Sequence, residues 1–514
     1  IFILYIEHCS KVKRRPYIAP SVACLKDYNE NIDGGLDFRE KIESVETCLA
    51  NFNIDAKVVN VVKGPTFSRL ELEVPPGISV NKIPAHYNDL AMSLAVESLR
   101  IEAPIPKKKF CGIEIPNEHR GTVGLKALIN SPEFNNTKKS GLYFALGKDI
   151  DGNCYVSDLT DFPHALVAGA SGSGKSVCLN CMIVSLLYKY SPEDMRLILI
   201  DPKVVEFSVY KDLPHLLAPE ILSDTNKMIN ALKWSIDEME RRYELLMTAR
   251  VSNINQYNEL AAKDKSVPKL PYIVIIVDEV ADIMQSKSAK EFESLVKRLT
   301  AKARAAGIHM ILATQRPSVD IITGTIKANL PTRVAFAVTS QVDSKTILDG
   351  AGADKLLGKG DMLYKLASKP HPVRVQSAFV DIAEVNAVVE EVVANNDRIY
   401  DEEIMKAFDY KEPEPEEHLA VASGGSPRSN SIESDPVFAD AVREAIESGG
   451  ISISMLQRRL SLGFPKAAKI LDTMEKLGYI SKQTPGNKQR EVYITMEQFL
   501  EKYPENGSDG ETDV

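Results

Sequence analysis

Hydrophobic residues gather along this chain in five short runs that are apolar at nearly every position, and stretches with helical spacing separate the runs. The runs are Ala165–Ala168, Leu197–Ile200, Tyr272–Val277, His309–Ala313 and Arg333–Val338. A strand buried on both faces of a sheet has this continuous apolar character. Strands that alternate with helices predict an α/β domain, in which a parallel sheet carries helices on both faces.

The first run is followed directly by Gly-x-x-x-x-Gly-Lys-Ser, the pattern of a P-loop. Its glycines let backbone N–H groups surround an anion. We expect Lys175 to reach the terminal phosphates of ATP and the Ser176 hydroxyl to hold Mg²⁺. A plain Gly/Ser-rich turn is the alternative, but the strand before, the helix after and the Lys-Ser pair favour nucleotide. The predicted nucleotide-binding residues are Gly169, Ala170, Ser171, Gly172, Ser173, Gly174, Lys175 and Ser176.

Two acidic residues, Asp278 and Glu279, end the run Tyr272–Val277. The carboxyl ends of parallel strands face the ligand in such sheets, so these residues are expected beside the P-loop. We predict that Asp278 holds Mg²⁺ through water and that Glu279 orients the attacking water. A strand that merely ends in solvated acids is the alternative, and the complete P-loop in the same domain argues against it.

A polar pair, Thr314-Gln315, ends the run His309–Ala313. Gln315 in this position can sense the γ-phosphate by hydrogen bonding. For this segment taken alone, an ordinary loop start is the simpler interpretation, because loops routinely begin with polar residues.

Several stretches closely resemble the motor domain of FtsK/SpoIIIE DNA translocases, including HALVAGASGSGKSVCLN, LILIDPKVVEFSVY, VIIVDEVADIM, KARAAGIHMILATQRPSVDIITGTIKANLPTR and LLGKGDML. The segment with GPTFSRLEL and SLRIEAPIP resembles the α domain of that family, and residues from about 435 to 495 resemble its γ domain. The resemblance implies a RecA-like ATPase motor with a preceding α+β domain and a C-terminal winged helix. It divides the chain into residues 1–37 (N-terminal segment), 38–135 (α domain), 136–400 (motor), 401–434 (linker), 435–500 (γ domain) and 501–514 (tail).

The resemblance also implies a mechanism. ATP and Mg²⁺ would bind at the P-loop and Asp278, Glu279 would activate water, and Gln315 would report loss of phosphate. A homohexameric ring would surround double-stranded DNA, and an arginine from the neighbouring subunit would reach the γ-phosphate. The candidates for this arginine are Arg241, Arg242, Arg304 and Arg316.

The C-terminal region is basic within an acidic chain. Residues 451–495 carry eight basic and three acidic side chains, whereas the formal net charge of all 514 residues is −9. Helices near 436–447, 453–460 and 464–477, followed by a turn at Pro485-Gly486-Asn487, predict a winged helix with its later helix in the major groove. A structural three-helix bundle with solvated lysines is the alternative. The predicted DNA contacts here are Arg458, Arg459, Lys466, Lys469, Lys488 and Arg490.

Motor loops are expected to hold DNA phosphates without sequence preference, with Lys327, Arg333 and Lys345 as plausible contacts, although surface lysines are usually just solvated. The family usually has arginines where the recognition helix here has Lys466 and Lys469. Lysine lacks the two-pronged fork of arginine, which leaves the preferred DNA sequence open.

No run of about eighteen apolar residues occurs anywhere in the chain. The family usually carries membrane spans before its α domain, so we interpret the chain as the cytoplasmic motor portion of a bacterial membrane protein, with a soluble relative as the alternative. The seven scattered cysteines suit a reducing compartment. We assign the pair Cys178 and Cys181, inside the predicted P-loop helix, to core packing.

The function these observations favour is an ATPase that pumps chromosomal DNA during division or sporulation, with tyrosine recombinases as partners that the resemblance suggests. A secretion-type ATPase that moves protein substrates is the alternative. Such ATPases usually carry several motor domains, whereas this chain has one P-loop and a winged-helix tail. A non-motor adaptor with a degenerate nucleotide site is a weaker alternative, because Lys175, Ser176, Asp278 and Glu279 are intact.

Overall fold

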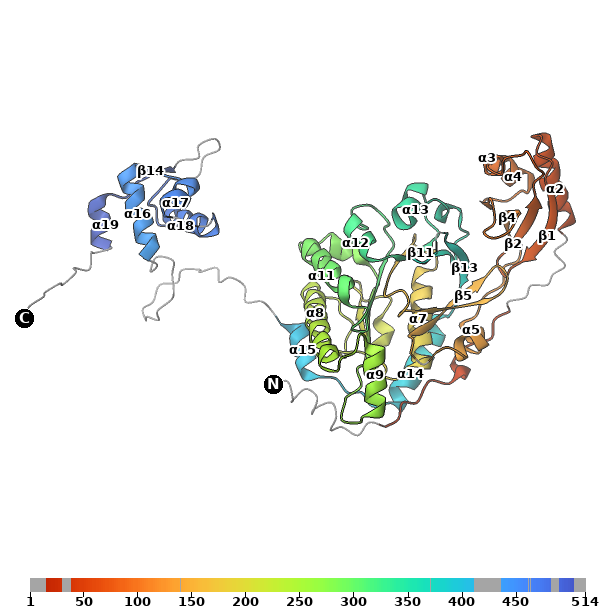
Figure 1. Ribbon diagram of the computed structural model, residues 1–514, viewed down its shortest axis with the longest axis horizontal. Coiled ribbons are helices and arrows are strands. Elements are labelled where there is room, and N and C mark those ends of the chain that lie inside the picture. The colour runs from red at the N-terminus through yellow and green to blue at the C-terminus, as the bar shows by residue number, and fades with distance from the viewer. Residues whose placement is uncertain are drawn as a thin grey trace, which may run out of the picture. The chain divides into compact units, whose positions relative to one another are not determined.

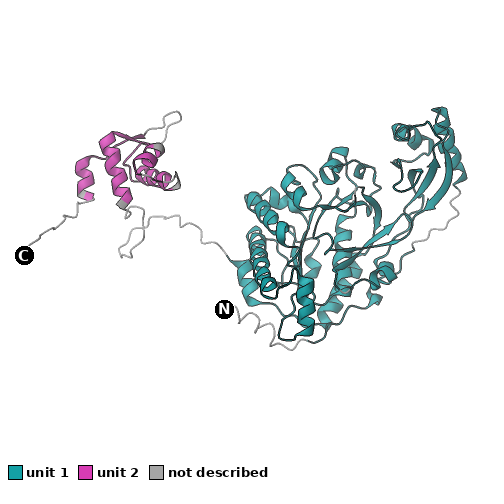
Figure 2. Ribbon diagram, viewed as in Figure 1, with its two compact units in different colours: residues 1–414 teal, residues 415–514 magenta. Residues whose placement is uncertain are grey.

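The structure is a computed structural model that describes residues 15–29, 38–138, 140–369, 371–410, 436–460, 462, 464–481 and 490–502. The chain divides into two compact units, residues 1–414 and 415–514 (Figure 2). Figure 1 labels many of the helices and strands of both units. Each unit has its own hydrophobic core, and each is described by itself.

The first part of unit 1 is a small antiparallel sheet with strand order β1-β2-β4-β3. Two helices, α2 and α4, pack on it around a core that includes Leu49, Leu70 and Ile113. The elements are α2 (Arg39–Asn51), β1 (Lys57–Lys63), β2 (Phe67–Glu73), α4 (Tyr87–Ser93), β3 (Arg100–Glu102) and β4 (Cys111–Pro116).

The remainder of unit 1 is built on a larger sheet, which has nine strands within the described residues, in the order β6-β5-β13-β12-β11-β7-β10-β9-β8. Its parallel part contains the five predicted strands: β7 (His164–Ala168), β8 (Met195–Ile200), β9 (Tyr272–Val277), β10 (Ile308–Thr314) and β11 (Thr332–Phe336). The predicted α/β fold is therefore confirmed for this half of the sheet.

Four antiparallel strands, which the sequence analysis did not predict, extend the sheet beyond β11. They are β5 (Tyr143–Asp149), β6 (Cys154–Asp158), β12 (Asp361–Lys365) and β13 (Val373–Ser377). They are short and contain charged residues such as Arg374, so they lack the continuous apolar run that marks a doubly buried strand.

Helices cover both faces of the large sheet, as predicted. Alternate residues of a strand point to opposite faces, so Val167 joins one core and Leu166 the other. One core includes α7 (Lys175–Lys189), α9 (Ile254–Lys263) and α14 (Ile382–Asn395). The other includes α8 (Thr225–Thr248), α10 (Val280–Met284), α11 (Ala289–Lys302), α12 (Gly324–Asn329), α13 (Gln341–Leu348) and α15 (Glu402–Asp409).

Residues 15–28, which we had placed in a separate N-terminal segment, lie against the motor. Tyr17 donates its hydroxyl to the carbonyl oxygen of Leu187, 2.7 Å away, and Tyr28 donates to Glu384 of α14 at 2.7 Å. Arg15 forms an ion pair with Asp397 just beyond the same helix. This part of the chain is thus a strap along α14.

Unit 2 contains α16 (Pro436–Ser448), β14 (Gly450–Ile451), α17 (Ile453–Arg459), α18 (Phe464–Lys476), β15 (Arg490–Glu491) and α19 (Met496–Lys502). β14 pairs antiparallel with β15, as the base of a wing does. The predicted turn at 485–487 and Lys488 lie outside the described residues. Helix α19 was not predicted, and its Phe499 is buried in the core of the unit.

Candidate nucleotide site

The P-loop joins the end of β7 to the start of α7, where the sequence motif requires it. Gly172 and Gly174 have φ values of +74° and +109°, in the left-handed region that favours glycine. A Cβ atom on Gly174 would lie 2.4 Å from the backbone nitrogen of Gly360. The same nitrogen donates a 2.8 Å hydrogen bond to the carbonyl oxygen of Ser173. The loop before β12, which contains Gly360, therefore packs directly against the backbone of the P-loop.

Lys175 is buried and bonded to Asp278. Its Nζ donates to the carboxylate Oδ1 and to the backbone carbonyl oxygen of Asp278, both at 2.7 Å. Burial raises the pKa of Asp278, while the Lys175 charge opposes that rise. In this arrangement the lysine neutralises a buried acid at the end of β9, so binding phosphate requires Nζ to leave Asp278.

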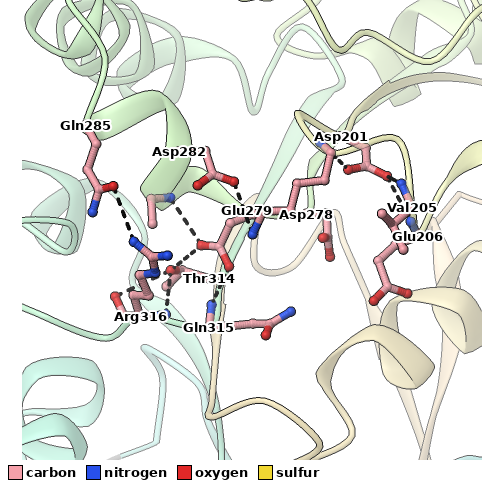
Figure 3. Close-up of polar contacts among 12 residues, drawn as sticks. Asp201, Val205, Glu206, Asp278, Glu279, Asp282, Gln285, Thr314, Gln315 and Arg316 are labelled. Atoms are coloured by element: carbon pink, nitrogen blue, oxygen red, sulfur yellow. Dashed lines mark hydrogen bonds and ion pairs between the residues drawn. The ribbon is translucent and has the colours of Figure 1, made fainter.

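Glu279 follows Asp278 and caps α10. Its Oε1 accepts from the Ala281 amide at 3.2 Å and from the Thr314 hydroxyl at 2.6 Å, and its Oε2 accepts from the Gln315 amide at 3.0 Å (Figure 3). The residue is 2% exposed. Strand β10 lies between β7 and β9, so its last residues bridge the P-loop and the two acids.

A third acid, Asp201, ends the neighbouring strand β8 and is 1% exposed. Its carboxylate accepts hydrogen bonds from the amides of residues 203–207, at 2.9 to 3.1 Å. Figure 3 shows this loop beside Asp278. The sequence analysis gave Asp201 no role. Its position at a strand's carboxyl end, like that of Asp278, was the available signal.

The P-loop residues fit a nucleotide triphosphate. The Ser173 hydroxyl is buried without a hydrogen-bond partner in the structure, and the amides of the first turn of α7 have no acceptor within their helix. A phosphate anion supplies such acceptors. Ser176 is partly exposed, and Asp278 is buried close to Lys175. The Ser176 hydroxyl and the Asp278 carboxylate are therefore the oxygen ligands that would hold Mg²⁺.

The four arginine candidates have different surroundings. Arg242 is 2% exposed and donates to Glu238 and to the carbonyl oxygen of Ala306. These contacts hold its side chain inside unit 1. Arg241 is partly buried and pairs with Glu238 at 2.6 Å. Arg304 and Arg316 are exposed. Arg304 lies before β10 and Arg316 after it, at opposite ends of the strand.

Two of the predicted DNA contacts in the motor are paired within the chain. Lys327 in α12 contacts Asp349 at 2.6 Å, and Arg333 also forms an ion pair with Asp349. Burial acts to raise the pKa of Asp349, but the hydrogen bonds from both cations outweigh burial and lower the pKa to about 2. Lys345 is exposed. Sequence reasoning missed Asp349 because it lies in a loop after α13, at a left-handed φ of 57°.

In unit 2, Arg458, Arg459, Lys466 and Lys469 are exposed on α17 and α18. Arg490 is mostly buried and forms an ion pair with Glu475. The two helices of this unit that carry most of the predicted contacts are thus accessible to a ligand, whereas Arg490 fastens β15 to α18.

The pair Cys178 and Cys181 is buried in the core around α7, which confirms the packing role. Burial raises the pKa of Cys178 to about 11 and that of Cys181 well above its usual value. Both thiols therefore stay protonated and unreactive in the folded chain. Among the described helices, none has the length and apolar character to cross a bilayer.

Comparison with known proteins decides the family. Residues 124–319 match the FtsK/SpoIIIE family, residues 19–117 the FtsK alpha domain and residues 432–495 the FtsK gamma domain. A "DNA translocase FtsK" of Haemophilus influenzae is 44% identical over 494 residues, which cover 91% of this chain and 91% of that protein. The chain belongs to the FtsK/SpoIIIE family. The resemblance stated from the sequence is thereby confirmed.

A "DNA translocase FtsK" of Clostridium tetani is 45% identical over 96% of this chain, and the chain spans 65% of that relative. It spans 58% and 62% of two further FtsK/SpoIIIE relatives with the same name, from Clostridium acetobutylicum and Caldanaerobacter subterraneus. A solved structure of the pCW3 conjugation coupling protein TcpA superposes with a TM-score of 0.48 at 21% identity, covering 68% of this chain and 99% of that one.

Proposed function

We propose that this chain is the ATP-driven motor and DNA-reading part of a translocase that moves along double-stranded DNA. One observation carries the proposal: Lys175, Asp278 and Glu279 gather at the carboxyl ends of β7 and β9, two parallel strands on either side of β10, in a chain whose family relatives are named DNA translocases. Hydrolysis of ATP would supply the free energy for movement.

The residues of the site would divide the work. Lys175 would exchange Asp278 for the terminal phosphates, which frees the Asp278 carboxylate to hold Mg²⁺ together with the Ser176 hydroxyl. Glu279 would orient the attacking water and accept its proton. Gln315, whose side chain is partly exposed beside Glu279, would contact the γ-phosphate.

Among the four arginines we favour Arg304 as the residue that reaches a neighbour's nucleotide. It is exposed, and it lies at the amino end of β10, whereas the chain's own P-loop lies at the carboxyl ends of the strands. An exposed side chain at that end of the strand can face a neighbouring subunit instead of its own P-loop. Arg316 lies at the same edge as its own P-loop, and Arg242 is held inside.

DNA is proposed to contact the motor through the β10–α12 loop and Lys327, and to contact unit 2 through Arg458, Arg459, Lys466 and Lys469. Because Lys327 and Arg333 share Asp349, phosphate binding would compete with that carboxylate. We further propose a homohexameric ring around the duplex, a role in bacterial chromosome partition at division or sporulation, recombinase partners, and a location at the cell membrane.

The test is the rate of ATP hydrolysis with and without linear duplex DNA, together with displacement of a triplex-forming strand. We expect DNA to raise the rate and increasing salt to abolish the effect. Lys175→Ala should remove both activities, and Lys406→Ala, at an exposed lysine of α15, should retain them. Glu279→Gln should bind ATP without hydrolysing it. A rate unaffected by DNA but raised by peptides would favour a protein-moving ATPase and refute the proposal.

A further inference from the structure

Thr314, the last residue of β10, contacts three parts of the candidate site through its polar atoms. Its carbonyl oxygen accepts the amide of Gly169, the first P-loop residue, at 3.2 Å. Its hydroxyl donates to Glu279 Oε1 at 2.6 Å and accepts from the Arg316 amide at 3.0 Å (Figure 3). The residue is fully buried, so its side chain has no water with which to exchange these bonds.

These bonds hold Glu279 in a fixed orientation. Both of its carboxylate oxygens already accept protein hydrogen bonds, from Ala281, Thr314 and Gln315. An attacking water must compete with these donors for the carboxylate. The Thr314 hydroxyl is the shortest of the three bonds, and the other two come from backbone amides fixed by α10 and by the end of β10. The hydroxyl is therefore the donor that can most readily be withdrawn.

A threonine hydroxyl carries one proton and can donate to one acceptor at a time. The alternative acceptor lies close by, because the carbonyl oxygen of Arg316 is 3.4 Å from the Thr314 oxygen. That distance is too long for a good O–H···O bond. A shift of Arg316 by several tenths of an ångström would make its carbonyl competitive with Glu279. The hydroxyl thus has two discrete arrangements, and the position of Arg316 selects between them.

Arg316 opens the loop that runs from β10 to α12. The loop exposes Ser318, Val319 and Asp320 and leads to Lys327, one of the proposed DNA contacts. The guanidinium of Arg316 is exposed and donates to Gln285, just beyond α10, at 3.3 Å. A phosphate backbone near this loop would attract the Arg316 charge away from that neutral amide.

We propose that Thr314 is a positioning residue that holds Glu279 in the DNA-free chain and releases it when a DNA phosphate attracts the Arg316 guanidinium. This inference rests on the proposed function and adds a regulatory step to the same site. The Thr314 O–H rotates from Glu279 Oε1 to the Arg316 carbonyl oxygen and keeps its proton. This leaves a lone pair of the carboxylate free to accept a hydrogen bond from the attacking water. DNA binding would thereby raise ATP turnover without altering the affinity for ATP.

The experiment compares ATPase rates of the full chain with and without linear duplex DNA for four proteins. They are wild type, Thr314→Val, Thr314→Ser and Thr332→Val. Valine matches threonine in shape and lacks the hydroxyl, and serine restores it. Thr332 is the matched control, since it is a fully buried strand threonine whose hydroxyl has no partner in the structure. Thermal melting and the KM for ATP show that each variant is folded and binds nucleotide.

For Thr314→Val we expect a higher DNA-free rate, an unchanged KM and a ratio of stimulated to basal rate about tenfold below wild type, the effect of one hydrogen bond to a charged group. Thr314→Ser and Thr332→Val should retain the wild-type ratio. A wild-type ratio in Thr314→Val, or equal loss of both rates, would overturn the inference. Absence of DNA stimulation in wild type would instead refute the proposed function, which separates the two failures.

Discussion

Replacing Arg374 by methionine is expected to destabilise unit 1 strongly. Arg374 lies in β13 and is 6% exposed. Its guanidinium donates to both oxygens of Asp361, at 2.9 and 2.6 Å, and to Glu114 of the small sheet at 2.7 Å. It also lies over the ring of Phe67, 3.8 Å from the centroid. Methionine keeps much of the packing volume and removes the charge.

The size of the effect follows from the carboxylates left behind. Burial lowers the pKa of Arg374, but Asp361 and Glu114 more than offset this and raise it. Glu114 retains Arg100 at 3.0 Å, whereas Asp361 keeps only a backbone donor, Leu357 at 2.8 Å. Breaking a buried pair from one side costs about 3–5 kcal/mol. With an unfolding entropy of about 2.1 cal/mol/K per residue, a unit spanning residues 1–414 should melt about 3 to 6 °C lower.

Thermal melting followed by circular dichroism measures the shift. Arg298→Met is the control, because that arginine is 57% exposed and its ion pair with Glu240 lies at the surface. If the loss comes from the stranded Asp361 charge, adding Asp361→Asn to Arg374→Met should restore most of the stability. An Arg374→Met protein that melts within 1 °C of wild type, or a double variant that melts lower still, would refute this reasoning.

Three further predictions concern the buried histidines, a glycine of the P-loop and the buried thiols. Burial lowers the pKa of His164 to about 3 and those of His215 and His309 to about 4. The free energy of unfolding should therefore fall as the pH drops below 6.5, by about 2 kcal/mol per histidine at pH 5. Urea titrations at pH 7 and pH 5 would measure this difference. Gly174→Ala should abolish ATP binding in a fluorescent-nucleotide titration, while Gly152→Ala, also at positive φ but with open space around it, should bind normally. Thiol reagents at pH 8 should modify Cys178 and Cys181 only after denaturation, and labelling of the native protein at either residue would contradict their burial.

The parallel half of the large sheet was predictable because each of its strands is doubly buried, which forces a continuous apolar run. β9 reads Tyr-Ile-Val-Ile-Ile-Val and is buried at every position. β13 reads Val-Arg-Val-Gln-Ser, and its polar side chains are buried too. Arg374 and Gln376 are satisfied by partners distant in sequence. A sequence pattern cannot reveal such partners, so the antiparallel half was missed.

The candidate site was also predictable only in part from the sequence. Lys175, Asp278 and Glu279 follow from local motifs and from the rule that parallel strands present their carboxyl ends at one edge. The bond from Thr314 to Glu279 depends on β10 lying between β7 and β9, and strand order is not encoded in any single strand. Thr314 was therefore interpreted only as part of a polar loop start.

Charged residues were the least predictable from the sequence. Lys327 and Arg333 were interpreted as cations available to phosphate, and both contact Asp349. Arg242 was one of four equivalent arginines, and its burial distinguishes it from Arg304. A count of charges gives the net field around a segment, but the pairing of each charge depends on tertiary contacts.

Hydrogen bonds fasten the P-loop from two directions. On one side the Gly169 amide bonds the carbonyl oxygen of Thr314, which leads into the β10–α12 loop. On the other side the P-loop accepts the amide of Gly360, and the adjoining Lys359 carbonyl is held by Gln376. Gln376 in turn accepts a hydrogen bond at 3.0 Å from the threonine that precedes β2 of the small sheet. These hydrogen bonds therefore join the P-loop to the β10–α12 loop on one side and to the small sheet on the other.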